Sequence, residues 1–204
     1  LAALAAGSGV VIKPARLAKR SGAVMVEALW EAGIPRDLLA LVDLGEAELG
    51  RELVADPLVD RVILTGAYET AERFRSFRED LPLLAETSGK NAIIVTPSAD
   101  LDLAAADLAK SAFGHAGQKC SAASIAILVG SVARSKRFQR QLVDAVTSMR
   151  VGWPDDPSSQ IGPIIEPAQG KLRHALTQLG ADEHWLVEPR PLDDTGRLWS
   201  PGIR

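Results

Sequence analysis

Short apolar runs alternate with longer amphipathic segments over the first 86 residues. Apolar runs rich in β-branched or aliphatic residues predict strands at 9–13, 39–42, 62–66 and 81–86. The amphipathic segments predict helices at 19–33, 46–55 and 69–80, with helix ends marked by Gly33 and by Asp56-Pro57. This alternation is typical of βαβ units in a parallel sheet, and the nearly continuous apolar character of the strands predicts cover on both faces.

A second series of elements begins after Ser88-Gly89. It comprises predicted strands at 91–95 and 125–130, predicted helices at 100–113 and 135–149, and a loop rich in proline and glycine at 152–163. Beyond residue 185, prolines and glycines predict an extended loop. We therefore predict an α/β fold with a domain boundary near residue 88, so that the two domains are 1–88 and 89–204.

Composition narrows the possible partners. Of the 204 residues, 47% are hydrophobic and 24% charged, which is ordinary for a soluble globular protein. The net charge is −3 and no basic run occurs, so nucleic acid is excluded as an expected partner. No apolar stretch reaches the roughly 18 residues of a membrane span, and no basic segment precedes the apolar start, so we expect a cytoplasmic protein. The sequence opens inside an apparent apolar helix and ends without a closing element, and we interpret it as a fragment.

Cys120 is the only cysteine, which excludes an intramolecular disulfide and a cysteine-rich metal site. It lies in GHAGQKCSAAS, where Gly114 and Gly117 allow the backbone to approach a ligand closely. Exposed amides beside a cysteine stabilise its thiolate and a developing oxyanion, as attack on a carbonyl requires. The alternative is a small buried hydrophobe, which the residue type alone favours.

Glu86 follows the apolar run LPLLA, so it is carried to the carboxyl end of a predicted strand. Ligand sites of open parallel sheets gather at that edge. A carboxylate partly withdrawn from water there is suited to take a proton from a thiol or from a water molecule. The alternative is a solvated turn residue.

Two further segments end predicted strands. Lys13 follows GVVI, where a lysine can hydrogen-bond ribose hydroxyls or approach a phosphate, although a plain surface lysine is the commoner case. Thr65-Gly66-Ala67 precedes a predicted helix, whose first N–H groups can face a diphosphate. The usual G-x-G-x-x-G dinucleotide fingerprint is absent.

Together, four motifs resemble the aldehyde dehydrogenase family, in the order GSGVVIKPA, ILTGAYETA, LAETSGKN and GQKCS. They are similar to its cofactor-lysine, glycine-turn, glutamate and nucleophile motifs, and the 34-residue interval from Glu86 to Cys120 is the family's usual one. The segment VGWPDDPSSQIGPIIEPAQGKL resembles the stretch after the nucleophile, so the resemblance covers the whole chain. It implies part of a Rossmann-like parallel-sheet NAD-binding domain followed by part of the catalytic domain.

Within the family, AETSGKNAIIV, AGQKCSA and LWSPGIR are most similar to L-glutamate γ-semialdehyde (Δ1-pyrroline-5-carboxylate) dehydrogenases, particularly those fused to proline dehydrogenase in bacterial bifunctional enzymes. The resemblance implies oxidation of that semialdehyde to L-glutamate in proline catabolism, by a homo-oligomeric protein. Cys120 would form a thiohemiacetal, Glu86 would activate the water that hydrolyses the thioester, and Ser121 would bind the substrate's α-carboxylate.

For the cofactor, the resemblance implies that Lys13 contacts the adenosine ribose, Thr65 lies near the nicotinamide, and Gly66-Ala67 faces the pyrophosphate. Arg16 departs from the pattern, because many members carry a glutamate there that bonds the ribose. An arginine instead favours the 2′-phosphate of NADP. We expect NAD, with NADP as the alternative.

Three parts of the family pattern are missing from the sequence. They are the upstream asparagine of the oxyanion hole, the downstream glutamate-phenylalanine-glycine-proline segment, and the oligomerising hairpin. The resemblance therefore predicts little or no activity for the isolated chain. Two rival classes are a cysteine hydrolase that pairs Cys120 with His115, five residues away and without an evident orienting acid, and a nucleotide-binding module without catalysis.

Overall fold

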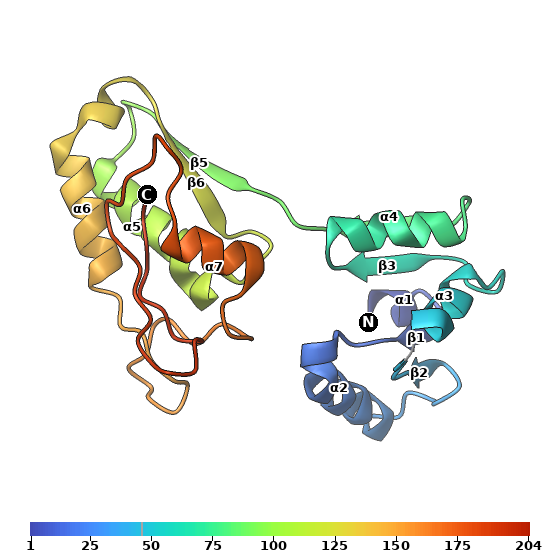
Figure 1. Cartoon of the computed structure of the whole chain (residues 1–204). Coiled ribbons are helices and arrows are strands. Elements are labelled where there is room, and N and C mark those ends of the chain that lie inside the picture. Colours follow the sequence, from blue (N-terminus) through green and yellow to red (C-terminus); the bar gives the residue numbers. More distant parts are fainter. Residues whose placement is uncertain (46) are drawn as a thin grey trace. The chain divides into compact units, whose positions relative to one another are not determined.

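The computed structural model describes residues 1–45 and 47–204, in which helices and strands alternate (Figure 1). This alternation confirms the α/β fold class. The chain divides into two compact units, Leu1–Thr87 and Ser88–Arg204, which are called the first and the second unit below.

The first unit contains four strands and four helices among its described residues. The strands are β1 (Val10–Ile12), β2 (Leu39–Leu41), β3 (Val62–Thr65) and β4 (Leu83–Glu86). The helices are α1 (Ala2–Ala5), α2 (Lys19–Glu31), α3 (Ala47–Ala55) and α4 (Tyr68–Phe77), and a 3-10 turn spans Arg16–Ala18. The strands and helices predicted from the apolar pattern are therefore confirmed, with small shifts at their ends.

Parallel pairing joins the strands two by two. β1 pairs with β2, and β3 pairs with β4, each through a helical connection, so two βαβ units are formed. The two pairs are separate two-stranded sheets rather than the single sheet that the alternation predicts. Among the described residues of the first unit, a hydrogen-bonded ladder thus links only strands that flank α2 or α4.

The sequence also predicted that the strands are covered on both faces, and this prediction is wrong for the first unit. Val11 in β1 is 51% exposed and Ile63 in β3 is 69% exposed, whereas their strand neighbours are partly buried. α2 contacts β2 and α4 contacts β4. Burial alternates along β1 and β3, as expected where successive side chains point to opposite faces and only one face is covered.

Two helix ends show how local sequence sets the boundaries. α2 ends at Glu31, and Gly33 then adopts a left-handed backbone with φ of 99°, as glycine does after many helices. α4 ends at Phe77, three residues before the predicted end. There Arg78 is extended, and its guanidinium donates hydrogen bonds of 2.7 and 2.8 Å to the carbonyl oxygens of Asp56 and Val59.

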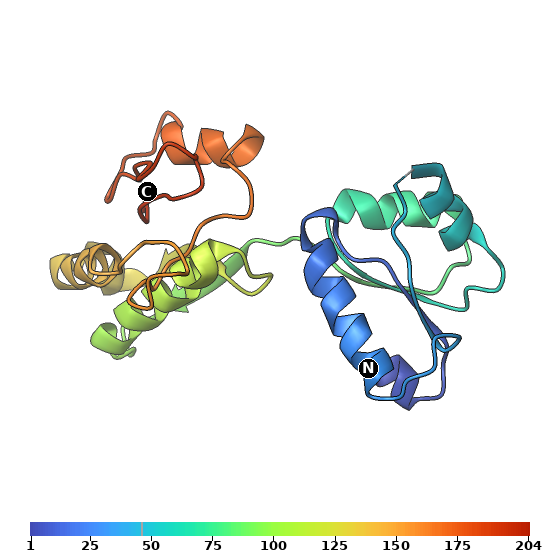
Figure 2. The same cartoon turned by 90° about the horizontal axis from the view of Figure 1, so that it is seen from below.

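The second unit begins with a third parallel βαβ unit. Its elements are β5 (Asn91–Val95), α5 (Leu101–Phe113), β6 (Ala123–Leu128), α6 (Lys136–Thr147) and α7 (Gly170–Thr177). Asp100 caps α5 by accepting hydrogen bonds from the backbone N–H groups of Asp102 and Leu103. Figure 2 shows α5 and α6 side by side within this unit.

The core of the second unit lies between the β5–β6 pair and these two helices. Phe138, Leu142 and Val146 recur every four residues along α6, so one face of that helix is buried. That face packs with Val95 of β5 and Leu108 of α5. The β5–β6 pair and α5 are the elements that flank Cys120.

Residues 150–204 are mostly extended loop around α7, as the prolines and glycines predict. Isolated bridges connect this region: Val151 with Ile161, Val187 with Ile203, and Pro191 with Trp199. Among the described residues, no helix combines the length and the apolar character needed to cross a membrane.

Candidate active site

Cys120 lies in the connection between α5 and β6. The N–H of Ala122 donates a hydrogen bond of 3.1 Å to the carbonyl oxygen of Lys119, so Cys120 and Ser121 are the two central residues of a β-turn. Both side chains are exposed. The buried-hydrophobe alternative for Cys120 therefore does not hold within the second unit.

The backbone just before this turn has an unusual conformation. His115, Ala116 and Gly117 are successive left-handed residues, with φ values of 55°, 55° and 68°. A Cβ atom at Gly117 would lie 3.1 Å from the carbonyl oxygen of Ala112, closer than ordinary contact. Left-handed backbone costs about 1–2 kcal/mol for a residue with a Cβ, so this segment needs fixed contacts around it.

Asn91 holds the backbone of the turn that follows this segment. Its Nδ2 donates hydrogen bonds of 2.6 Å to the carbonyl oxygen of Cys120 and 3.1 Å to that of Ala122. Asn91 also stands at a register shift, where Ser124 is the extra residue of β6, and bulges of this kind are common beside functional sites. Sequence reasoning missed this role, because Asn91 was visible only as the first residue of a strand.

Glu86 is the last residue of β4. It lies opposite Thr65 in the parallel register, and the N–H of Gly66 donates a hydrogen bond of 3.1 Å to its carbonyl oxygen. The structure thus brings Glu86, Thr65 and Gly66 to one edge of the β3–β4 pair, the carboxyl edge that the sequence indicated. The Glu86 side chain is exposed in the first unit, so the expected partial withdrawal from water is not present within that unit.

Thr65, Gly66 and Ala67 connect β3 directly to α4. Ala67 is the N-cap residue of α4 and has no side-chain oxygen, so the first N–H groups of the helix receive no side-chain cap. Glu69 lies in the first turn of α4, where a carboxylate interacts favourably with the helix dipole.

Lys13 and Arg16 follow β1. Lys13 is exposed, and its Nζ donates a long hydrogen bond of 3.4 Å to the adjacent Pro14 carbonyl oxygen. Arg16 is also exposed and begins the 3-10 turn that leads into α2. Lys13 therefore lies at the carboxyl end of a strand, as predicted, and Arg16 lies four residues beyond that strand.

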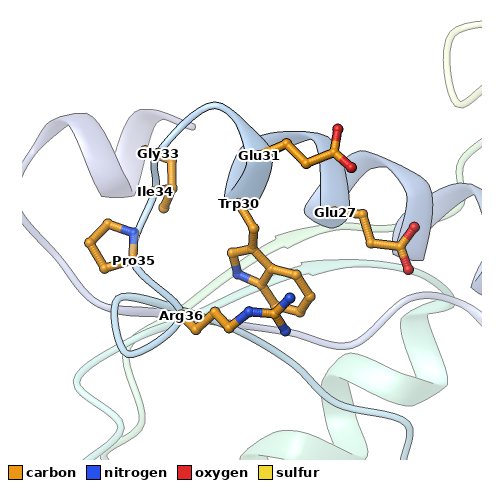
Figure 3. Close-up of a pocket in the computed structure, with 7 residues that line it drawn as sticks. All are labelled: Glu27, Trp30, Glu31, Gly33, Ile34, Pro35 and Arg36. Carbon is orange, nitrogen blue, oxygen red and sulfur yellow. The ribbon is translucent and has the colours of Figure 1, made fainter.

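One pocket of the first unit lies away from all these residues. Figure 3 shows Trp30 and Arg36 side by side in it, with the Arg36 guanidinium 3.9 Å from the ring centroid of Trp30. The remaining lining residues are Glu27, Glu31, Gly33, Ile34 and Pro35. Because this pocket precedes β2 whereas Lys13 follows the parallel strand β1, the two lie at opposite edges of the strand pair.

A pocket of the second unit lies between α7 and the loop before Trp199, lined in part by Arg173, Arg190 and Asp193. None of the sequence-predicted site residues lines either pocket. In the described part of the chain, no three His, Cys, Asp or Glu side chains are grouped as metal ligands would be.

The predicted residues thus fall on two units. The cofactor-side residues and Glu86 belong to the first unit, whereas Cys120 and Ser121 belong to the second. Comparison with known sequences decides the family, because the model of the family described as "Aldehyde dehydrogenase family" matches residues 1–203. The chain belongs to the aldehyde dehydrogenase family. This confirms the family to which the four motifs pointed.

Relatives within the aldehyde dehydrogenase family include a 1-pyrroline-5-carboxylate dehydrogenase of Bacillus subtilis (strain 168). The two sequences are 34% identical over 203 residues, which is 96% of this chain but 39% of that protein. The bifunctional protein PutA of Salmonella typhimurium (strain LT2) is also 34% identical, over 98% of this chain and 16% of its own length. The chain therefore spans less than half the length of these aldehyde dehydrogenase relatives.

A solved structure gives the same family at closer similarity. Proline utilization A (PutA) from Corynebacterium freiburgense is 53% identical to this chain and superposes with a TM-score of 0.92. The match covers 98% of this chain and 21% of that one. The aldehyde dehydrogenase fold thus accounts for both units.

Proposed function

We propose that the intact protein oxidises L-glutamate γ-semialdehyde to L-glutamate, with NAD as the electron acceptor, Cys120 as the nucleophile and Glu86 as the general base. The observation that carries this proposal is the exposed β-turn that presents Cys120 in a chain of the aldehyde dehydrogenase family. Relatives named as 1-pyrroline-5-carboxylate dehydrogenase and PutA support the substrate.

The first unit, Leu1–Thr87, is proposed to hold the cofactor. The chemistry of its residues fits a dinucleotide, because α4 begins just after Gly66-Ala67 and its first N–H groups have no side-chain cap. Lys13 offers an exposed ammonium group for ribose hydroxyls. Thr65 lies next to Gly66 at the same edge, where it would adjoin the nicotinamide. When bound, NAD supplies the two-electron acceptor for the reaction.

The second unit, Ser88–Arg204, is proposed to carry the first chemical step. The Cys120 thiolate attacks the aldehyde carbon, so a C–S bond forms and the carbonyl electron pair moves to oxygen. Ser121, beside Cys120 in the turn, is proposed to bind the substrate's α-carboxylate through its hydroxyl. Loss of hydride from the same carbon then converts the thiohemiacetal into a thioester.

Hydrolysis of the thioester is the proposed task of Glu86. Its carboxylate takes a proton from a water molecule while the water oxygen attacks the thioester carbon. The C–S bond then breaks, and the electron pair returns to sulfur as the Cys120 thiolate. The product is the carboxylate of L-glutamate.

The decisive experiment measures turnover of the intact protein with L-glutamate γ-semialdehyde and with other aldehydes, alongside Cys120→Ser. We expect the semialdehyde to have the highest kcat/KM and Cys120→Ser to be inactive. Retained activity in Cys120→Ser would overturn the nucleophile. A higher kcat/KM for another aldehyde would overturn the substrate.

Cofactor choice depends on Arg16, which lies just beyond β1. We propose NAD, with kcat/KM for NAD above that for NADP, and we expect Arg16→Glu to lower the rate with NADP further, because a carboxylate repels a 2′-phosphate. A preference for NADP in the unaltered protein would overturn this assignment.

The intact protein is proposed to be a homo-oligomer. We also propose that it carries a proline dehydrogenase domain, and the similarity to the bifunctional protein PutA supports that second point. Light scattering and a proline-dependent dye-reduction assay test these two points. Because the chain spans 39% of its Bacillus subtilis relative, we expect residues 1–204 alone to have little or no dehydrogenase activity. A substantial semialdehyde-dependent rate of NADH formation by residues 1–204 would refute this.

A further inference from the structure

The side-chain amide of Gln118 connects two loops that are far apart in the sequence. Its Nε2 donates hydrogen bonds of 3.1 Å to the carbonyl oxygen of His115 and 3.2 Å to that of Pro163. Its Oε1 accepts a hydrogen bond of 2.8 Å from the N–H of Ile165. Both amide hydrogens and the amide oxygen are therefore engaged, and the partners lie 3 and up to 47 residues away along the chain.

The first of these loops is the one that leads to Cys120. Its left-handed residues, His115 to Gly117, lie outside the regular hydrogen bonding of α5 and β6. The Gln118 amide bonds the carbonyl oxygen of His115 at one end of this segment, and Cys120 follows two residues after Gln118. A shift of the backbone at Gln118 therefore moves the Cys120 thiol, because only Lys119 lies between the two residues.

The second loop is itself held firmly. Ile164 and Arg197 exchange hydrogen bonds, from the Ile164 N–H to the Arg197 carbonyl oxygen and from the Arg197 Nε to the Ile164 carbonyl oxygen, each of 2.9 Å. The Arg197 guanidinium also lies 5.2 Å from the ring centroid of Trp153. Pro163–Ile165 is thus a fixed anchor for the Gln118 amide, supported from a segment near residue 197.

We propose that Gln118 is a positioning residue, which holds the Cys120 turn in its reactive orientation by tying it to the Pro163–Ile165 segment, with Arg197 as the support of that anchor. This inference rests on the proposed role of Cys120 as nucleophile. Gln118 is exposed, so its side chain contributes no core packing. Loss of its hydrogen bonds acts on orientation, to which reaction geometry is steeply sensitive.

The test compares variants of the intact protein by three measurements. Gln118→Met keeps the side-chain length and removes all three hydrogen bonds, whereas Gln118→Glu keeps the acceptor for Ile165 and loses both donors. Gln178→Met is the matched control, because Gln178 is an exposed glutamine with no side-chain hydrogen bond to the described residues. The measurements are kcat and KM, the rate of Cys120 alkylation by iodoacetamide across pH, and the Tm.

For Gln118→Met we expect kcat to fall about 10-fold or more, KM for the semialdehyde to stay within about 2-fold, and alkylation of Cys120 to slow at every pH. Gln118→Glu should fall in the same direction, and Gln178→Met should match the unaltered protein. A lower Tm with unchanged kcat and alkylation rate would overturn the inference, because it would show a role in stability alone. If Gln118→Met does not fold, Gln118→Glu decides by the same criteria.

A double-mutant cycle with Arg197→Ala tests the support. Because both residues act through the same segment, we expect the combined fall in kcat to be clearly smaller than the product of the two separate falls. A combined fall equal to that product would overturn the link. An active Cys120→Ser overturns the proposed function instead, whereas an inactive Cys120→Ser beside an unaffected Gln118→Met overturns only the role of Gln118.

Discussion

The Nδ2 of Asn91 donates a hydrogen bond of 2.6 Å to the carbonyl oxygen of Cys120. The same amide donates to the carbonyl oxygen of Ala122, so one side chain holds both the turn and the residue just before β6. Because these bonds go to the backbone, the turn is fixed while the thiol of Cys120 stays exposed. A nucleophile needs this combination of a fixed backbone and an open side chain.

Asn91→Asp tests that relationship with almost no change in size. A carboxylate cannot donate, so the carbonyl oxygens of Cys120 and Ala122 would face a negative charge. We expect the free energy of unfolding to fall by about 1–3 kcal/mol, because two acceptors lose their donor. Alkylation of Cys120 by iodoacetamide should also slow, because a nearby negative charge disfavours the thiolate.

Gln178→Glu is the control for Asn91→Asp, since it makes the same amide-to-acid change on an exposed side chain of the second unit. Urea denaturation and the alkylation rate are measured for both variants. If Asn91→Asp matches Gln178→Glu in both measurements, the Asn91 bonds do not hold the turn.

Gly66→Ala probes the proposed cofactor edge. The added Cβ would lie 3.3 Å from Cδ1 of Leu64, the end of a flexible side chain, so the fold should lose less than about 1 kcal/mol. The methyl group does, however, stand where the backbone would approach a pyrophosphate. We expect KM for NAD to rise about 10-fold with little change in kcat, as measured by initial rates over a range of NAD concentrations.

Gly45→Ala is the control for Gly66→Ala, because a Cβ at Gly45 meets no described atom within 4 Å. Its KM for NAD should equal that of the unaltered protein. Equal KM values in Gly66→Ala and Gly45→Ala would remove Gly66 from the cofactor edge.

The sequence was most informative where the physical signal is local. Apolar runs predicted the strands and helices, because the period of apolar residues acts within a few residues. Glu86 and Thr65 were placed at one strand edge for the same reason, since each ends an apolar run. The end of α4 was missed, because it depends on hydrogen bonds from Arg78 to carbonyl groups about 20 residues earlier.

The contacts that hold Cys120 could not be read from the sequence. Asn91 lies 29 residues before Cys120, and Gln118 bonds a loop up to 47 residues away. No spacing rule links such positions, because pairing of β5 with β6 and the path of the later loop bring them together. A polar residue at the start of β5 and a glutamine two residues before the cysteine were visible, but only geometry gives them roles.

Ala116→Gly tests the left-handed segment before Gln118. Ala116 has φ of 55°, where a Cβ atom is strained and glycine is not. Removing that strain offsets the greater freedom of glycine in the unfolded chain, so we expect the stability to change by less than about 1 kcal/mol or to rise. Ala109→Gly, in the interior of α5, should instead destabilise the protein by about 1 kcal/mol or more.

Urea denaturation of these two alanine variants gives the comparison directly. A loss in Ala116→Gly as large as that in Ala109→Gly would show that the left-handed backbone at Ala116 carries no strain. Because a glycine also loosens the loop, kcat should fall in Ala116→Gly while the free energy of unfolding does not.

We expect the stability of the segment that contains Arg197 to depend on pH, because of the hydrogen bonds that Asp193 accepts. The hydroxyl of Thr195 donates a hydrogen bond of 2.7 Å to its Oδ2, and the N–H of Leu198 donates one of 3.3 Å to its Oδ1. These bonds, that of Thr195 foremost, hold the pKa of Asp193 below its ordinary value of 3.8. The folded loop therefore favours the ionised form more than the unfolded loop does.

The sign of the effect follows from that lowered pKa. Stability from Asp193 is fully present above its ordinary pKa and is lost as the pH falls through the lowered folded value. Below pH 3.8 we therefore expect faster amide hydrogen exchange at Leu198 in the unaltered protein relative to its own value at pH 6, after correction for intrinsic exchange. Asp193→Asn keeps an acceptor oxygen but cannot titrate, so its corrected exchange should not change over this range.

Asp156→Asn is the control, because Asp156 also has a lowered pKa, caused first by the backbone N–H of Ser158, but lies in another loop. Its Leu198 exchange should follow that of the unaltered protein, and equal acid dependence in Asp193→Asn would show that this carboxylate does not hold the loop.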